Sequence, residues 1–241
     1  MNENYWLQCN EPTPMIRYLH SSRPYDERKL RLLACAVCRQ VWELLDDARS
    51  RRAVEIAERF ADGRASLKEL ARARGDALLA VGRGARSVAW AAYWAANTKA
   101  SGPLWHAFAA AVGATARQAV GESHSGSAQV WDESQAEGNR EQADLIREVI
   151  GNPFRPALPR PEWLRWNHGV IPAMARSIYL ERTWEQMPIL GDALEEAGCT
   201  ESLWLDHCRS AKQHVRGCWL LDALGAAPEG ATTIAAGDCS L

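Results

Sequence analysis

The sequence predicts an all-α protein, a multi-helix bundle of about eight to ten helices, and three observations support this fold class. Apolar residues recur at helical spacing in one segment after another, and no segment alternates as a strand would. Alanine accounts for 40 of the 241 residues and tryptophan for 11, so helices can approach closely while indole rings fill the gaps between them. Residues that favour helix starts and stops separate the segments.

In the N-terminal half, residues 1–150, capping residues divide the chain into helices. The expected helices cover residues 12–20, 26–45 and 48–63, followed by a fourth from residue 66. Asp26 can cap the second helix, and Asp46–Asp47 can open the third. Gly63 is suited to end the third helix, and the S-x-x-E pattern that begins at Ser66 is a capping box.

The middle of the chain, residues 66–122, is rich in alanine and tryptophan and continues the helical pattern. The Gly-Pro pair at 102–103 is expected to break this segment into two helices. Residues 121–139 are polar and contain several glycines and serines, which predicts a loop. A helix is expected to follow over residues 141–150.

Four prolines in residues 151–162 predict an extended connection to a C-terminal helical half, residues 151–225, which packs on the first half. The expected helices of this half are 161–182, 188–197, 201–209 and 217–224. Residues 226–241 resemble a flexible tail. We expect the two halves to form one folded unit.

Composition and charge exclude several classes of protein. Hydrophobic residues make up 47% of the chain, yet the mean hydropathy is −0.32, which excludes a transmembrane bundle. The 28 basic and 30 acidic residues give a net charge of −2 without a basic tail, which argues against a nucleic-acid partner. No signal-peptide pattern or membrane-spanning stretch is present, so we expect a cytoplasmic protein with no membrane contact and with reduced cysteines.

The strongest candidate site combines cysteines and histidines from the two halves. Cys35 and Cys38 form a C-x2-C pair within a helix, where a spacing of three places both thiols on one face. A second cluster near the C-terminus contains His207, Cys208, His214 and Cys218. Thiolate and imidazole are ligands that zinc prefers, so these six residues are the predicted metal ligands, with the final set left open. The competing interpretation is that Cys35 and Cys38 are ordinary core cysteines of an apolar helix.

Other chemistry receives less support from the sequence. A thiolate–imidazolium pair of His207 with Cys208, or of His214 with Cys218, is a second interpretation, but neighbouring residues of a helix point about 100° apart, and Gly217 interrupts the second pair. The carboxylates of residues 192–196 are typical of a solvated helix face. The common phosphate-binding, hydrolase, zinc-protease and kinase motifs are absent from the sequence.

Several longer motifs carry a resemblance. They are K-L-R-L-x-A-C-x-x-C-R at 29–39, G-N-P-F-R-P at 151–156, P-I-L-x-D-A-L-E-E-A-G-C at 188–199 and H-V-R-G-C-W at 214–219. Over most of residues 5–225 the chain resembles a large uncharacterised bacterial family, found in many paralogous copies in planctomycete-type genomes. The resemblance implies an all-helical cytoplasmic protein and no established activity. Members commonly have C-A-C-C-R where this chain has Val37 as the middle residue, so that third thiol is no essential ligand here.

The sequence therefore favours a helical binding or regulatory module for a macromolecular partner, most simply a protein. In this hypothesis the zinc site is structural. The alternative is a metalloenzyme that uses the same Cys/His cluster with an open coordination position. A closed tetrahedral site would favour the module, whereas a water ligand within a pocket would favour the enzyme.

Overall fold

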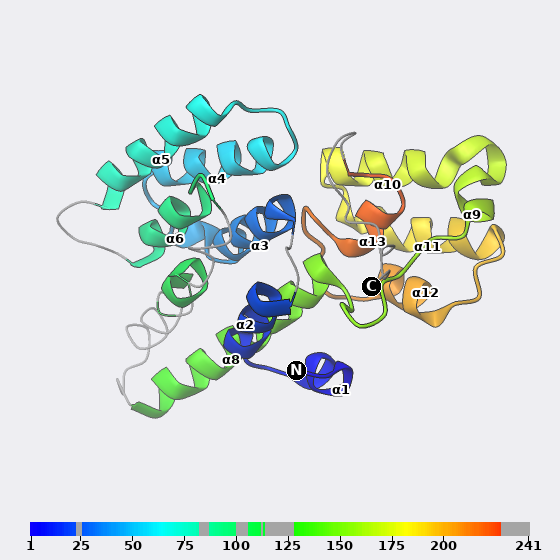
Figure 1. The fold of residues 1–241 in the computed structure, drawn as a ribbon, viewed down its shortest axis with the longest axis horizontal. Coiled ribbons are helices and arrows are strands. Elements are labelled where there is room, and N and C mark those ends of the chain that lie inside the picture. Colours follow the sequence, from blue (N-terminus) through cyan, green and yellow to red (C-terminus); the bar gives the residue numbers. More distant parts are fainter. Residues whose placement is uncertain (23–25, 82–86, 100–105, 112, 114–127, 228–241) are drawn as a thin grey trace, which may run out of the picture. The chain divides into compact units, whose positions relative to one another are not determined.

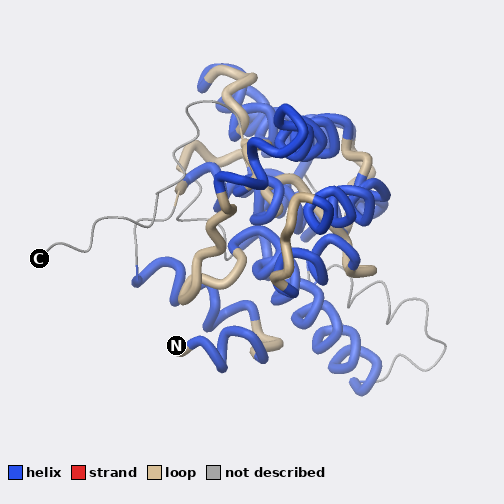
Figure 2. Tube along the Cα trace, turned by 90° about the vertical axis from the view of Figure 1, so that its right-hand side faces the viewer, coloured by secondary structure: helices blue, strands red, loops and turns tan. Residues whose placement is uncertain are grey.

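The computed structural model in Figure 1 describes residues 1–22, 26–81, 87–99, 106–111, 113 and 128–227. Within these residues the chain forms twelve α-helices and three short 3-10 helices, and Figure 2 shows no strand among them. The predicted all-α multi-helix fold is confirmed. The predicted helix break at 102–103 and residues 228–241 of the predicted tail lie outside the described part of the chain.

The chain divides into two units, which we describe separately. Among the described residues, unit 1 covers 1–147 and unit 2 covers 148–227. The long helix α8 (Ala128–Ile150) runs across this division, so its last three residues belong to unit 2.

In unit 1, helix α3 is buried on nearly all sides, as its apolar sequence predicts. The helices before α8 include α1 (Glu3–Gln8), α2 (Pro12–Ser22), α3 (Glu27–Gln40), α4 (Ala48–Ala61), α5 (Leu67–Val81) and α6 (Ser87–Ala95), with the 3-10 turn η1 (Trp42–Leu44) after α3. Helix α3 packs against α4 and α6, and α4 packs against α5. A two-pronged ion pair joins α3 to α4, in which Arg39 donates to both carboxylate oxygens of Glu58 at 2.9 and 2.8 Å.

The predicted helix starts in unit 1 are confirmed by their capping hydrogen bonds. Asp26 accepts from the backbone N–H of Arg28 at 2.9 Å, which caps α3. At α5, Ser66 donates its backbone N–H to Glu69 at 2.7 Å and accepts the N–H of Glu69 at 3.2 Å, a reciprocal capping box.

The loop predicted over residues 121–139 is wrong for its described part, because α8 already begins at Ala128. Polar residues form the first half of this helix, and side-chain pairs along it replace apolar burial. Gln129 donates to Glu133 at 2.8 Å four residues on, and Arg140 pairs with Glu137. Serine and glycine content alone therefore misled the prediction.

Unit 2 is a set of short helices around one core. They are α9 (Pro161–Arg165), η2 (Trp166–Gly169), α10 (Val170–Glu181), η3 (Trp184–Gln186), α11 (Met187–Glu196), α12 (Ser202–Arg209) and α13 (Trp219–Ala223). The core includes Trp163, Tyr179, Leu190, Trp204 and Leu221, each at most 1% exposed. The single helix predicted over 161–182 is instead two helices, because Asn167 and His168 adopt left-handed conformations between α9 and α10.

Candidate metal centre

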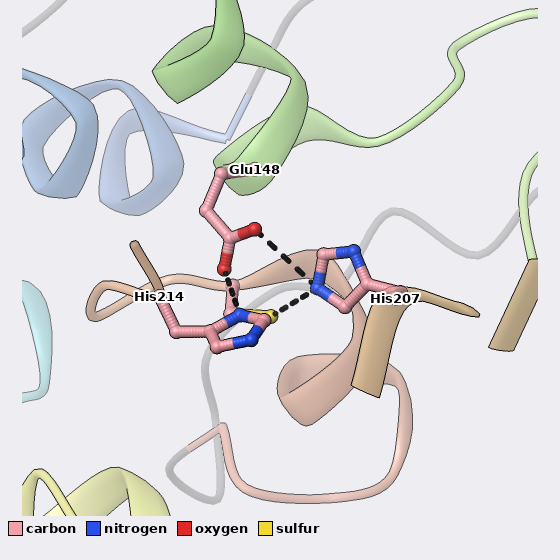
Figure 3. Close-up of side chains that lie close together, drawn as sticks. Glu148, His207 and His214 are labelled. Atoms are coloured by element: carbon pink, nitrogen blue, oxygen red, sulfur yellow. Dashed lines mark hydrogen bonds and ion pairs between the residues drawn. The ribbon is translucent and has the colours of Figure 1, made fainter. Parts of the chain in front are cut away.

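Four side chains of unit 2 lie close together, those of Glu148, His207, His214 and Cys218. Figure 3 labels the first three of them. Glu148 lies in the last turn of α8, and His207 lies in α12. His214 lies in the connection between α12 and α13, and Cys218 is the residue that caps α13. Each offers one atom able to bind a metal, and these four atoms lie within 4.8 Å of one another. The group can therefore hold a metal ion.

The end of α8 is shaped to place Glu148. Val149 is fully buried, so the last turn carries a carboxylate directly beside an apolar side chain. Helix α8 ends at Ile150, and Gly151 follows with a φ of +73°, a conformation that strains other residues. A Cβ atom at Gly151 would lie 3.1 Å from the indole ring of Trp219, so glycine also permits the chain to pass close to α13.

The position of His207 follows from the packing of α12. Trp204 and Cys208 face the core, and His207 lies on the flank of the same helix. The imidazole ring of His207 packs against the indole of Trp219, with ring centroids 4.8 Å apart, and against His214, at 5.0 Å. These contacts restrict the ring without occupying the nitrogen that faces the cluster.

The thiol of Cys218 lies at the start of α13. The backbone N–H groups of Leu220 and Leu221 hydrogen-bond to this sulfur, which favours the thiolate. Burial acts in the opposite direction and is the larger effect, with the nearby Glu148 carboxylate next, so the pKa of the Cys218 thiol is raised well above its usual value. The thiol is therefore protonated at neutral pH unless a cation is bound beside it.

Three close contacts link the side chains of the cluster, and its four ligand atoms lie within 4.8 Å of one another. Glu148 Oε1 lies 3.1 Å from His214 Nδ1, and Glu148 Oε2 lies 3.4 Å from His207 Nε2. His207 Nε2 lies 3.2 Å from Cys218 Sγ. Bonds of about 2.0 Å to nitrogen or oxygen and about 2.3 Å to sulfur, arranged tetrahedrally, separate ligand atoms by about 3.3 to 3.5 Å. The three contacts are thus near this separation, although those to the histidines use different oxygens of Glu148.

The protonation of His207 suits metal binding. Burial lowers the pKa of its imidazole to about 4, although the Glu148 carboxylate acts against this shift. His207 is therefore neutral at pH 7, with a lone pair free on one ring nitrogen. A neutral His207 also leaves the negative charge of the buried Glu148 carboxylate uncompensated by that ring, which a bound cation would correct.

Three of the six predicted ligands, His207, His214 and Cys218, belong to this group. Cys208 does not, although it is fully buried in the core of unit 2, where burial raises its thiol pKa to about 12. Cys208 packs against Gly191. A Cβ atom added at Gly191 would lie only 2.9 Å from the Cβ of Cys208.

Cys35 and Cys38 lie side by side in α3 of unit 1, and both are buried. The Sγ of Cys35 lies 3.8 Å from the carbonyl oxygen of Val54, and burial raises the pKa of the Cys38 thiol to about 12. These surroundings are those of core cysteines. A metal shared by this pair with the C-terminal residues stays a prediction.

Glu148 is the member of the group that sequence reasoning missed. Its signal is an acidic residue on the apolar stripe of a helix, between Leu145 and Val149, where a solvated carboxylate is out of place. The prediction rested on cysteine and histidine spacing, and it interpreted the carboxylates of residues 192–196 as a solvated helix face. There the structure shows surface ion pairs, because Arg209 bonds Asp192 at 2.9 Å and also Glu195.

No family model, curated protein or solved structure matches this chain. Within the described residues, none of the helices is both long and apolar enough to cross a membrane.

Proposed function

We propose that the protein is a helical binding module whose unit 2 is held together by one structural zinc ion. The observation that supports this most strongly is the cluster of Glu148, His207, His214 and Cys218, whose ligand atoms lie within 4.8 Å of one another. The ion would be bound by two neutral imidazoles, one carboxylate and one thiolate. Their summed charge of about −2 balances a divalent cation, so the complex is neutral, as suits a buried site.

Zinc fits this donor set better than magnesium or calcium does. Magnesium and calcium prefer six or more oxygen ligands, whereas this cluster offers one thiolate, two nitrogens and one carboxylate. The four protein donors fill a tetrahedron without a ligand from α3, so the site needs neither Cys35 nor Cys38. With no position left for water, the closed set favours a structural role over the metalloenzyme alternative.

Elemental analysis of the full chain, purified without chelator, tests the proposal. We expect one zinc per chain. The matched pair Cys218→Ser and Cys208→Ser decides which thiol binds, because both thiols are fully buried in unit 2 and only Cys218 lies in the cluster. Cys218→Ser should lose the zinc, and Cys208→Ser should keep it. A wild-type chain without zinc, or zinc loss from both variants, would overturn the proposed site.

We also propose that the macromolecular partner is a protein rather than a nucleic acid. Several exposed arginines already have acidic partners, including Arg49 with Asp47 at 2.7 Å and Arg160 with Glu201 at 2.9 Å. Such pairs leave less positive charge for a phosphate backbone. Fluorescence anisotropy with labelled duplex DNA and RNA at low salt should show no binding, and salt-dependent binding would contradict this part of the proposal.

We also propose that the protein belongs to the planctomycete-type family and is located in the cytoplasm. The six cysteines within the described residues are free, as a reducing compartment requires, and a thiolate ligand depends on the reduced form. If the family assignment is right, an alignment of members should retain an acidic residue at position 148 together with His207, His214 and Cys218. Loss of that acidic residue in members that keep the other three would count against the four-ligand site.

A further inference from the structure

Three of the four candidate ligands lie within or next to the connection between α12 and α13, residues 210–217. His207 precedes it in α12, His214 lies within it, and Cys218 follows it directly. We call this segment the ligand loop. It forms no regular helix or strand along its length. A metal ion bound by these residues would therefore pin the loop at both ends and at one internal point.

The exposed part of the ligand loop is separate from its buried part. Ala211, Lys212 and Gln213 are exposed, whereas His214 and Val215 are buried. At the start of the loop, Ser210 N–H donates to the carbonyl of His207 at 3.3 Å. Towards its end, Cys218 N–H donates to the carbonyl of Val215 at 3.1 Å, and the Arg216 guanidinium donates to the carbonyl of Leu180 at 3.4 Å. Exposed backbone with little buried apolar contact has a low free energy of local opening.

Helix α13 depends on the same anchoring. It has five residues, which is far below the length at which an isolated helix is stable in water. Leu220 and Leu221 bury it in the core of unit 2, and its capping residue is the candidate ligand Cys218. The metal would thus be bonded to the point where the ligand loop enters α13.

We propose that metal occupancy orders the ligand loop, so that the loop is closed in the zinc-bound protein and opens when the ion is removed. This inference rests on the proposed zinc site and adds a regulated conformational change to it. Ordering the segment between His207 and Cys218 costs chain entropy, and the bonds to the ion offset that cost only while the ion is bound.

The change would alter the surface of unit 2. Residues Ser210–His214 line a pocket together with Trp184, Met187 and Pro188. Opening of the loop removes one wall of this pocket. The surface that unit 2 presents at this point therefore depends on zinc.

Limited trypsin digestion of the full chain measures the opening directly, because Lys212 is exposed in the loop. Zinc-loaded and chelator-stripped protein are digested in parallel, and cleavage after Lys212 is followed by mass spectrometry. Cleavage after Arg64, which is exposed in the turn between α4 and α5 of unit 1, serves as the internal standard. We expect removal of zinc to accelerate cleavage after Lys212 at least tenfold relative to the standard, and added zinc to reverse the effect.

Two variants keep the result interpretable. Cys218→Ser in the presence of zinc should be cleaved like the stripped wild type, whereas Cys208→Ser should retain the zinc response. If elemental analysis finds zinc and cleavage after Lys212 is the same with and without it, the loop proposal is overturned while the structural site stands. If the wild type binds no zinc, both proposals fail.

Discussion

At the scale of single residues, the ionisation of the donors favours a bound cation. Glu148 is 7% exposed, and one of its two imidazole neighbours, His207, has a pKa of about 4. Cys218 is fully buried, and its raised thiol pKa keeps it protonated without a cation. Binding of a divalent ion converts this arrangement into a neutral complex, with the thiol proton of Cys218 released to solvent.

Replacement of Glu148 by glutamine tests whether this residue is a metal ligand or a catalytic base. Glu148→Gln keeps the volume of the side chain and removes its charge, so as the fourth ligand it should lower zinc affinity by at least about tenfold, an effect that even outer partners of ligands reach. Competition with a zinc-binding dye measures the affinity. Glu141→Gln, an exposed position on the same helix, is the control. An unchanged zinc affinity in Glu148→Gln would contradict its role as a ligand and would favour the metalloenzyme alternative, with Glu148 as a base.

The thiols of α3 give an independent test. If unit 2 supplies every ligand, Cys35→Ser and Cys38→Ser should each retain one zinc per chain. Both changes bury a hydroxyl among apolar neighbours, so each should lower the free energy of unfolding by about 1–3 kcal/mol. Chemical denaturation and elemental analysis of the same samples measure the two effects separately. Loss of zinc without a change in folding would reinstate the C-x2-C pair as ligands.

The sequence indicated the residue types of a metal centre, but it did not indicate which residues belong to that centre. His207, His214 and Cys218 are close in sequence, so their spacing pointed to the site. Glu148 precedes His207 by a long stretch of chain, and only folding brings the two together. Cys208 and Cys218 looked equivalent in the sequence. Only the fold distinguishes them, because Cys218 belongs to the cluster and Cys208 faces the core of unit 2.

At the scale of helices, capping patterns were more reliable than composition. The starts at Asp26 and Ser66 were predicted because a side-chain acceptor must satisfy backbone N–H groups there. The polar start of α8 was missed because its stabilising contacts are pairs of polar side chains. The break at Asn167 and His168 was missed because neither residue requires a positive φ from its type alone.

Glycine positions give a stability prediction at this scale. Gly191→Ala in α11 would place a Cβ 2.9 Å from the Cβ of Cys208, which forces α11 and α12 apart. We expect it to lower the free energy of unfolding by about 1–3 kcal/mol. Gly75→Ala, in the middle of α5 with nothing within 4 Å of the new Cβ, should raise it by about 0.5–1 kcal/mol. Denaturant titration checks both values, and similar effects at the two positions would contradict the close approach of α11 and α12.

At the scale of the whole molecule, the chain carries two cores that differ in what supports them. Unit 1 relies on long helices and on α3 buried among them, whereas unit 2 uses several short helices around a tryptophan-rich core. Short helices have little stability of their own, so a bound ion adds proportionally more to unit 2. The all-α class was predictable from helical spacing, but the support that a metal gives to one unit depends on contacts that the sequence does not display.

Removal of zinc should therefore destabilise unit 2 selectively. Zinc present at about a thousand times its dissociation constant raises the free energy of unfolding by about 4 kcal/mol. Hydrogen exchange followed by mass spectrometry should show faster exchange in α12, the ligand loop and α13 after chelation, with α3 and α4 unchanged. Equal acceleration in both units would show that the ion is not specific to unit 2.

The zinc coordination shell tests the central claim most directly, and X-ray absorption at the zinc edge of the purified full chain reports it. The account predicts one sulfur at about 2.3 Å and three nitrogen or oxygen atoms at about 2.0–2.1 Å. This shell corresponds to Cys218 with His207, His214 and Glu148. Two or more sulfur ligands would mean that a second cysteine binds the ion, and would contradict the site described for unit 2.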